Sequence, residues 1–581
     1  MKSRSLDLLR QTNNKVDLAK LLGVSPVFLT NTLYRIKVET LYNQIKIPKK
    51  TGGIRYIYSP DSRLKEIQRN LSNLLLNCLD EIRAENKTKA IISHGFEREK
   101  NIITNAKKHI NKNIVLNLDL ESFFDSFNFG RVRGFFIKNK YFLLNDEVAT
   151  VIAQISCLNI QIGERKISIL PQGSPCSPVI TNLISSSMDI KLNSLAKRNR
   201  CTYTRYADDI TISTNLMSFG KQIVKDVDEN NNVSLGNKLI SYIEKSGFVI
   251  NDKKTRIQYK NSRQDVTGLL VNKKINPSRK YSDILRSMCN SLFNSGEFEL
   301  IDKEKKKRKG TINELEGKLS FVDQIDRFNN KDILSKGGVL LKNRRENLYS
   351  KFIYFKKFIF NDEVTVITEG HTDHIYIRSA AISRKDKFND LIKEDNKKIK
   401  LNFSFLKINN KIEYLLDVRE GTSSIKKFIE RFPENYSKYN IGKPKKPVII
   451  ILDNDSGSSG SGGIFQLLIS DKFKNITNDK DEIRNVEFIH VFGNLYIIFT
   501  PLKDGKDTSM EDLFSDEILN KKMNEKKFNR TNKKCKNDEF GKDYFARFVI
   551  KPNVKTIDFS KFDTIFNRIK LVISDYEKKE I

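Results

Sequence analysis

The chain has 581 residues, of which 38% are hydrophobic and 30% are charged. This length predicts roughly two to four domains, and the apolar content excludes a chain that is disordered throughout. Lys and Arg number 104 against 71 Asp and Glu, which gives a net charge of +33. Such an excess favours a polyanionic partner, because each phosphate that a cation neutralises releases counterions.

The cysteine pattern and the first residues indicate a cytoplasmic protein. The cysteines lie far apart and none forms a CxxC pair, which argues against a zinc ribbon or a disulfide framework and fits a reducing compartment. The N-terminal sequence carries scattered charges instead of an apolar core, and no apolar run reaches the length of a membrane span. We therefore expect neither a signal peptide nor contact with a membrane.

The N-terminal part of the chain alternates helical patterns with one glycine turn. Residues 1–40 carry apolar side chains at the spacing of short amphipathic helices. Gly52 and Gly53 separate two β-type segments, which predicts a basic hairpin. A helical pattern then covers 62–82.

Two short apolar strands with acidic residues follow, at 114–119 and 205–212. Asp119 ends the first strand, and Asp208 and Asp209 interrupt the second, where unpaired acids would be costly to bury. A hairpin with Asp208 at its tip would carry the pair to a sheet edge beside Asp119. Three converging carboxylates suit Mg²⁺, and two such ions support phosphoryl transfer. Taken alone, an Asp-Asp pair is more typical of an ordinary turn.

The strings around these acids resemble the reverse transcriptases. Residues 206–209, Tyr-Ala-Asp-Asp, resemble the YxDD box; residues 118–124 resemble the first acidic motif, and 171–175 the loop between them. The resemblance covers roughly residues 40–330. It implies an RNA-directed DNA polymerase with an α+β right-hand fold of fingers, palm and thumb, acting on deoxynucleoside triphosphates with Mg²⁺ or Mn²⁺.

The same resemblance implies roles for single residues. Asp119, Asp208 and Asp209 would be the catalytic metal ligands. Five further residues match positions that contact the incoming nucleotide or the template pair: Arg55, Lys50, Phe124, Gln172 and Gly173. Lys254 matches a proton donor to pyrophosphate. For Phe124, Arg55 and Lys254, plain packing or a surface charge is the alternative.

Two further strings resemble those of retron reverse transcriptases. Residues 105–109 match an NAxxH element, and 266–268 a Val-Thr-Gly triplet. The RNA-recognition residues that this implies are Asn105, Ala106, His109, Val266, Thr267 and Gly268. The resemblance implies a cognate structured non-coding RNA, priming from a guanosine 2′-hydroxyl, and branched multicopy single-stranded DNA, with host ribonuclease H removing template. A group II intron-like enzyme is the alternative. The basic run 303–309 is a solvated helix or loop, or a thumb segment that contacts phosphates.

A second acidic constellation lies after residue 362, where strand and helix patterns alternate. The apolar runs 364–367 and 448–452 are typical of parallel strands covered on both faces. Glu369 follows the first run, and Asp453 and Asp455 follow the second. Because parallel strands end at the same sheet edge, we expect these carboxylates to meet and to hold Mg²⁺.

Glu-Gly-x-x-Asp at 369–373, followed by Asp-x-Asp at 453–455, resembles the Toprim domain. The resemblance implies an α/β domain with a mainly parallel sheet, a catalytic Glu369, and metal ligation by Glu369, Asp453 and Asp455. Asp373, Glu511 and Asp512 are possible further ligands. A fusion of this kind implies an effector nuclease in antiphage defence. A non-catalytic binding module, or a scaffold with degenerate sites, is the alternative.

The domain organisation expected from these patterns has three parts. A reverse transcriptase covers 1–345, with N-terminal helices, fingers and palm at 1–275 and a thumb at 276–345. A linker covers 346–361, and the Toprim-like domain covers 362–581. The glycine- and serine-rich stretch 456–463 is predicted to be a flexible loop, and the Lys- and Asn-rich stretch 520–542 a loop or mobile insertion. The sequence does not predict an oligomeric state.

Overall fold

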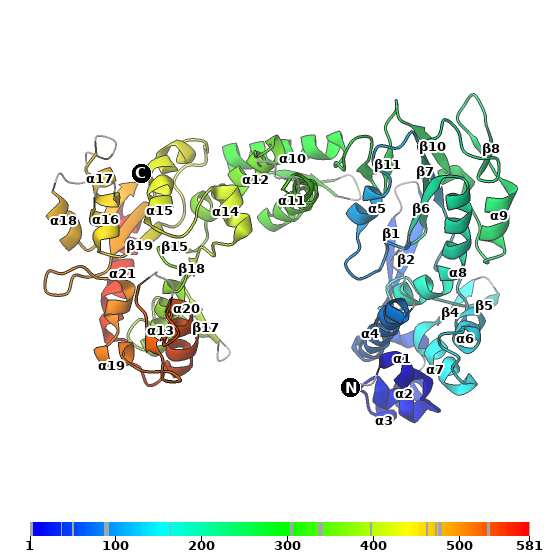
Figure 1. Cartoon of the computed structure of the whole chain (residues 1–581), viewed down its shortest axis with the longest axis horizontal. Coiled ribbons are helices and arrows are strands. Elements are labelled where there is room, and N and C mark those ends of the chain that lie inside the picture. Colours follow the sequence, from blue (N-terminus) through cyan, green and yellow to red (C-terminus); the bar gives the residue numbers. More distant parts are fainter. Residues whose placement is uncertain are drawn as a thin grey trace. The chain divides into compact units, whose positions relative to one another are not determined.

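The structure is a computed structural model of the chain (Figure 1). It describes residues 4–36, 38–48, 52–85, 92–162, 164–302, 306–334, 341–395, 398–460, 463–470, 473, 479–531 and 535–579. The chain divides into two compact units, the first made of Met1–Arg279 with Ile325–Gly338 and the second of Lys280–Gln324 with Val339–Ile581. Within the described ranges, no helix combines the length and the apolar character needed to cross a bilayer.

The first unit opens with three short helices, α1 (Ser5–Arg10), α2 (Lys15–Leu21) and α3 (Pro26–Thr30), as the apolar spacing predicts. The side chains of Asn14 and Ser25 cap α2 and α3 by accepting backbone N–H groups. The long helix α4 (Ser62–Glu85) covers the predicted helical stretch and packs against α1.

The predicted basic hairpin is present. Strand β1 (Tyr42–Pro48) pairs antiparallel with β2 (Ile54–Pro60), with Ile47 opposite Arg55. Gly52 and Gly53 lie in the left-handed region, with φ values of 89° and 84°, which residues with a Cβ rarely adopt.

A four-stranded antiparallel sheet forms the centre of this unit. Its order is β10 (Arg256–Tyr259), β3 (Ile114–Asp119), β7 (Asp209–Thr214) and β6 (Cys201–Tyr206). Helix α8 (Ser177–Arg198) packs against β6, and the apolar side chains of sheet and helices join one core. The two strands predicted from the acidic motifs are therefore neighbours.

The second unit is built around a five-stranded sheet of order β18 (Phe403–Phe405), β15 (Val364–Thr368), β19 (Val448–Leu452), β21 (Leu495–Phe499) and β20 (Ile489–Phe492). All neighbours are parallel except β20, which runs antiparallel to β21. In the central strand, Val448, Ile450 and Leu452 face one core, and Ile449 and Ile451 face another. Every residue of this strand is buried, because helices cover both faces of the sheet.

Helices from distant parts of the chain cover these two faces (Figure 1). One core includes side chains of α15 (Thr422–Tyr436) and α17 (Ile464–Leu468). The other includes side chains of α13 (Asp373–Ser383) and α21 (Asp563–Lys578).

The segment expected to be the thumb belongs to both units. Its helices are α10 (Arg279–Ser295) and α11 (Ile312–Leu334), and residues 280–324 form part of the second unit's compact body. Their side chains share a core with α12 (Arg344–Tyr354). The compact units thus divide the chain elsewhere than at the predicted linker 346–361, because the apolar face of α10 and α11 packs against α12.

The basic run 303–309 is neither a helix nor a plain loop where it is described. Lys307–Lys309 form strand β14, which pairs antiparallel with β13 (Glu299–Ile301). Each of its cations contacts a carboxylate: Lys307 pairs with Glu299, Arg308 with Glu314 and Lys309 with Glu297. These pairs explain why a run of like charges can form a strand.

Two stretches that were predicted to be loops contain short regular elements where they are described. The stretch after Asp455 forms the short helix α16 (Ser456–Ser459), which the Asp455 side chain caps. In the Lys- and Asn-rich stretch, β22 (Lys527–Phe528) pairs with β23 (Glu539–Phe540). The Phe528 ring stacks on Phe545, with centroids 4.1 Å apart. Sparse aromatic anchors thus hold a segment whose composition is otherwise typical of a loop.

Candidate functional site

The first acidic set gathers at the ends of β3 and β7. Asp119 and Asp209 are cross-strand partners in register, and the Leu120 N–H donates to the Asp208 carbonyl at 3.1 Å. Ala207 and Asp208 form the two-residue turn between β6 and β7, with Ala207 at a φ of 57°. The predicted hairpin and the proximity of these carboxyl groups are both present.

Lys254 and Asn251 contact the Asp119 carboxylate from the loop before β10. The Lys254 ammonium lies 2.9 and 3.0 Å from the two carboxylate oxygens, and the Asn251 amide donates to one of them at 3.1 Å. Asp119 is buried, whereas the Lys254 side chain is half exposed. A cation is therefore already held at the carboxylate group.

The environment works against full ionisation of these acids. Burial raises the pKa of Asp208, and the negative charge of Asp119 adds to the rise. Burial, followed by repulsion from Asp208 and Asp119, raises the pKa of Asp209 to about 6. The positive charges of Lys254 and Arg55 lower the pKa of Asp208 and so partly offset the repulsion. Bound cations would complete this compensation.

A buried polar network that the sequence did not reveal contacts the backbone of the Ala207–Asp208 turn. The fully buried Arg205 guanidinium donates to the Ala207 carbonyl at 2.9 Å and to both carboxylate oxygens of Asp189 at 2.8 Å. It also donates to the Asn182 amide oxygen. The bidentate ion pair orients the guanidinium, and the guanidinium holds the backbone of the Ala207–Asp208 turn in place.

Two glycines permit close approach of backbone segments around the turn. A Cβ on Gly95 would lie 2.6 Å from the Ala207 nitrogen. Gly173 has a φ of +117°, and a Cβ there would lie 2.5 Å from the Tyr58 carbonyl. The Tyr58 N–H donates to the Gln172 carbonyl at 2.7 Å. The predicted nucleotide-contact loop thus packs against strand β2.

The other predicted nucleotide-contact residues lie in the same region, as far as they are described. Arg55, on β2, is near enough to lower the pKa of Asp208. The Phe124 ring packs edge-on against Phe96, with centroids 6.2 Å apart. Lys50 lies outside the described residues.

The predicted RNA-recognition strings pack against each other. Asn105 and Ala106 are buried in α5 (Ile102–Lys107), which packs on the hairpin of β11 (Asp265–Val266) and β12 (Leu269–Leu270). Thr267 and Gly268 form the turn of that hairpin, both with positive φ, and Val266 is buried.

His109 is an interior residue of this group. Its ring nitrogens lie 2.7 Å from the Ser213 hydroxyl and 2.8 Å from the Thr204 hydroxyl, and burial lowers its pKa to about 3. Buried side chains cannot contact RNA directly in this conformation. A part in RNA recognition would therefore act through the position of α5 and its hairpin, and it stays a prediction.

The second acidic set gathers at the ends of β15 and β19. Thr368 pairs with Ile451, so Glu369 and Asp453 leave neighbouring strands together. Glu369 accepts the Asp453 N–H at 3.1 Å and the Thr422 hydroxyl at 2.5 Å. Burial raises the pKa of Glu369, and the charge of Asp455 adds to the rise.

Asp373, Asp453 and Glu511 are the most buried members of this set. Burial raises the pKa of Asp373, and repulsion from Glu511 adds to the rise. Burial also raises the pKa of Asp453, where the largest added repulsion comes from Asp373. Glu511 reaches the set because Asn454 and Thr508 exchange backbone hydrogen bonds of 2.9 and 3.0 Å. Sequence spacing did not predict that bridge.

Lys542 supplies a counter-charge that the sequence did not reveal. Its ammonium lies 3.1 Å from a Glu511 carboxylate oxygen and lowers the pKa of Asp373, Asp453 and Glu369. It comes from the end of the stretch expected to be a loop. A second acidic group is thus again accompanied by a lysine.

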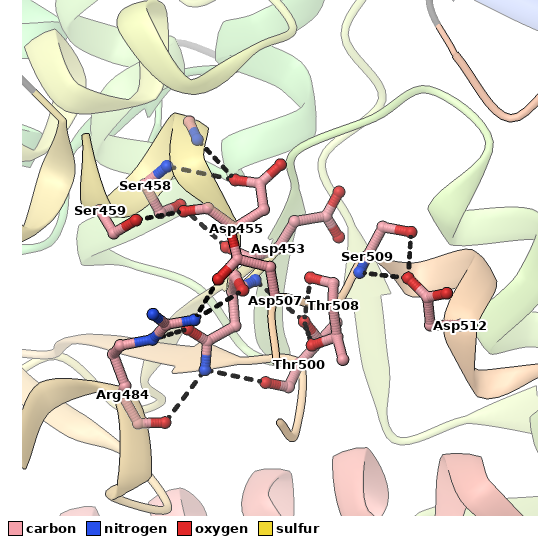
Figure 2. A network of polar contacts seen from close by, with 12 residues as sticks. Asp453, Asp455, Ser458, Ser459, Arg484, Thr500, Asp507, Thr508, Ser509 and Asp512 are labelled. Carbon is pink, nitrogen blue, oxygen red and sulfur yellow. Dashed lines mark hydrogen bonds and ion pairs between the residues drawn. The ribbon is translucent and has the colours of Figure 1, made fainter. Parts of the chain in front are cut away.

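Two of the predicted ligands have other partners (Figure 2). Asp455 accepts the N–H groups of Gly457 and Ser458 as the cap of α16. Asp512 accepts the N–H and hydroxyl of Ser509 and pairs with Arg530 at 2.8 Å. Asp512 is therefore placed as a helix cap and not with the acidic set; the Ser-x-x-Asp spacing is a capping signal.

In the described part of the chain, no three or more His, Cys, Asp or Glu side chains are arranged so that they could hold a metal ion as they stand. The donor chemistry of both acidic sets nevertheless fits a hard divalent cation, because each set offers several carboxylate oxygens. Each set includes a carboxyl group with a raised pKa and already contacts a positively charged lysine, so further positive charge would be favourable there. The residues that would hold such ions are Asp119, Asp208 and Asp209 in the first set, and Glu369, Asp453 and Asp373 with Glu511 or Asp455 in the second.

The first unit has the elements of a nucleic-acid polymerase: an antiparallel palm sheet, three aspartates at a hairpin tip and its neighbouring strand, and a two-stranded fingers hairpin. A family model described as reverse transcriptase (RNA-dependent DNA polymerase) matches residues 47–271. The first unit is therefore a reverse transcriptase domain.

Named relatives narrow this class. Retron Ec86 reverse transcriptase of Escherichia coli is 31% identical over 344 residues, which cover 58% of this chain and 93% of the relative. Retron Mx65 reverse transcriptase of Myxococcus xanthus is 32% identical over 49% of this chain and 64% of the relative. The chain belongs to the retron reverse transcriptase family, which decides against the group II intron-like alternative.

Among solved structures, telomerase from Candida albicans is similar over 54% of this chain and 58% of its own, with 12% identity and a TM-score of 0.29. The matched relatives leave about half of this chain without a counterpart, and the family model ends at residue 271. The second acidic set therefore lies outside the family match.

Proposed function

We propose that the first unit is an RNA-directed DNA polymerase that copies a cognate structured non-coding RNA. It would prime from a guanosine 2′-hydroxyl of that RNA and yield branched multicopy single-stranded DNA, with deoxynucleoside triphosphates as substrates and host ribonuclease H trimming the template. The observation that carries the proposal is the in-register pairing of Asp119 with Asp209 beside Asp208, in a chain of the retron reverse transcriptase family.

The chain's own residues would divide the work as follows. The three aspartates hold the cations, and Lys254 and Asn251 keep Asp119 oriented. Arg55 contributes positive charge for the triphosphate, and Phe124 excludes a 2′-hydroxyl by its bulk. Bound Mg²⁺ supplies activation of the primer hydroxyl and stabilisation of the pyrophosphate. Gln172 and Gly173 position the template pair through a loop that β2 supports.

The test uses the purified full chain with the RNA from its flanking locus. The parent is expected to make a branched DNA, and Asp208→Asn with Asp209→Asn is expected to make none while still binding the RNA. A branched product that survives the double substitution would refute the assignment.

For the second unit we propose a Toprim-like, Mg²⁺-dependent nuclease that acts as an antiphage effector restrained by the RNA–DNA product. The support is that Glu369 and Asp453 follow the carboxyl ends of neighbouring parallel strands, where open α/β sheets locate their sites, and that Asp373 and Glu511 are near enough to raise the pKa of Asp453. Glu369 would be the catalytic carboxylate, and Asp453 the central ligand.

A second candidate function is a non-catalytic nucleic-acid-binding or regulatory module. One observation favours it: Lys542, the Thr422 hydroxyl and the Met510 N–H contact the carboxylates of Glu511, Glu369 and Asp453 and so compensate part of their charge. Glu369→Gln separates the two candidates. An effector nuclease is expected to lose Mg²⁺-dependent cleavage of DNA or RNA and phage protection with it, whereas a binding module would keep protection.

A further inference from the structure

A cavity of about 880 Å³ with many polar lining residues lies in the second unit. It is lined by α14 (Asn410–Leu416), by the loop that follows and by α15. Three cations line it, Arg419, Lys427 and Arg431, together with the hydroxyl groups of Ser423 and Ser424. Cations and hydroxyl donors on one wall are the groups that bind phosphate oxygens.

The negative charges in the lining are already compensated. Glu413 pairs with Arg419 at 2.7 Å, and Asp417 pairs with Lys342 at 2.8 Å. Lys427 and Arg431 make no ion pair among the described residues, and both side chains are exposed. The cavity therefore retains two cations without carboxylate partners.

These two cations are arranged in a row. Ser423, Lys427 and Arg431 are four residues apart along α15, so their side chains lie on one face of the helix. One turn of helix separates Lys427 from Arg431, about 6 Å along the axis. Such a row suits successive phosphates of a chain better than a single small anion.

The helix that carries this row begins at the acidic set. Thr422 is the first residue of α15, and its hydroxyl donates to the Glu369 carboxylate at 2.5 Å. The Gly421 N–H donates to the Glu369 carbonyl at 3.1 Å. One end of α15 is thus bound to the proposed catalytic glutamate, while Lys427 and Arg431 lie successively farther along the helix.

We propose that this cavity binds backbone phosphates of a nucleic-acid strand whose adjoining nucleotides lie at Glu369. The proposal rests on the nuclease function proposed above and names the surface through which its substrate is held. Lys427 and Arg431 bind the phosphates, Ser423 donates a hydroxyl hydrogen bond, and Arg419 stays paired with Glu413. The residues are positioning groups, since none contacts the reacting bond.

Lysine footprinting of the full chain tests this site without relying on activity. An amine-reactive acylating reagent labels exposed lysines, and mass spectrometry of peptides reports Lys427 separately from other nucleic-acid-binding surfaces. The probes are an oligothymidylate strand and ATP at equal phosphate concentration. Lys445, an exposed lysine outside the cavity, is the internal control. We expect the strand to protect Lys427 and to leave Lys445 labelled.

The Arg431→Gln variant sharpens the test, and Lys446→Gln is its charge-matched control outside the cavity. Each phosphate contact with a single strand contributes about 0.7 to the slope of log affinity against log salt concentration. The slope measured from Lys427 protection is expected to fall by about that amount in Arg431→Gln and to stay unchanged in Lys446→Gln.

Each outcome decides the matter. Absence of Lys427 protection, equal protection of Lys445, or protection by ATP as strong as by the strand would overturn the proposal. Glu369→Gln separates it from the nuclease assignment. If that variant still cleaves, the catalytic assignment fails while the footprint stands on its own; if the parent cleaves but Lys427 is unprotected, only the proposal made here fails.

Discussion

Asp119 and Asp209 face each other across β3 and β7, and Lys254 bridges both oxygens of the first of them. The pairing explains how residues far apart in sequence form one site: the register of the two strands places both carboxyl groups at the same sheet edge. The ammonium of Lys254 also lowers the pKa of Asp208 and Asp209, so a single cation affects all three acids.

Removing this cation should impair the chemistry more than binding. We expect Lys254→Met to slow single-nucleotide incorporation by about 10²-fold, the scale of a lost general acid, while primer–template binding in a gel-shift assay stays unchanged. Lys253→Met, at the exposed neighbouring position, is the matched control. Incorporation at the parental rate in both variants would contradict a role for Lys254.

We expect Arg205 to affect nucleotide incorporation, through the Ala207–Asp208 turn, as well as the stability of the protein. Arg205→Met leaves Asp189 buried without its cation and is expected to cost about 3–5 kcal/mol in urea unfolding. Adding Asp189→Leu removes the stranded charge and should recover much of that loss. Incorporation should stay low in the double variant, because the Ala207 carbonyl still lacks its donor. Recovery of both properties together would make Arg205 purely structural.

The close approach of Gly95 to the turn predicts a steric effect. Gly95→Ala would place a methyl group 2.6 Å from the Ala207 nitrogen, so the backbone must shift, and we expect a loss of about 1–3 kcal/mol together with slowed incorporation. Gly134→Ala is the control, since nothing lies within 4 Å of its Cβ position in helix α6 (Phe129–Lys138). Alanine there should be neutral or stabilising.

Local patterns in the sequence are enough to predict where the acids lie. An apolar run that ends in a carboxylate marks a strand end, and this signal alone locates Asp119, Glu369 and Asp453. Their partners are not encoded locally. Arg205 and Asp189 meet only because α8 packs on β6, and Glu511 arrives through the bridge between Asn454 and Thr508.

Composition does not predict individual contacts. Segment 520–542 has the composition of a loop, and the sequence predicts neither the stacking of Phe528 on Phe545 nor the contact of Lys542 with Glu511. The Ser509–Asp512 pair reads equally as a ligand motif and as a helix cap, and only the contacts distinguish the two.

His109 predicts an acid-dependent loss of stability in the first unit. Burial lowers its pKa from 6.5 to about 3, so between these values the unfolded chain binds a proton that the folded chain does not. The contribution of neutral His109 to the free energy of unfolding is complete above the pKa of the unfolded chain. It is lost as the pH falls below that value, by up to about 1.4 kcal/mol per pH unit.

The measurement is hydrogen exchange of peptides from β6 and β7 at about pH 7 and about pH 5. His109→Gln keeps two hydrogen-bonding groups without a titrating ring, so its protection should depend less on pH than that of the parent. His371→Gln, at a half-exposed position, should match the parent. The same pH dependence in all three proteins would exclude His109 as the source.

Lys542 tests whether the second acidic set is a cation site. Lys542→Met leaves Glu511, Asp373 and Asp453 buried together without their counter-charge, and we expect the second unit to lose about 3 kcal/mol of stability in EDTA. Mg²⁺ binds the folded state only and should restore part of that loss by mass action.

The measurement is thermal unfolding with EDTA or Mg²⁺, in an Asp208→Asn, Asp209→Asn background that removes the palm ligands. Lys521→Met, at an exposed position, should behave like the parent, and a Mg²⁺ shift absent from parent and variant alike would rule out metal binding by these acids.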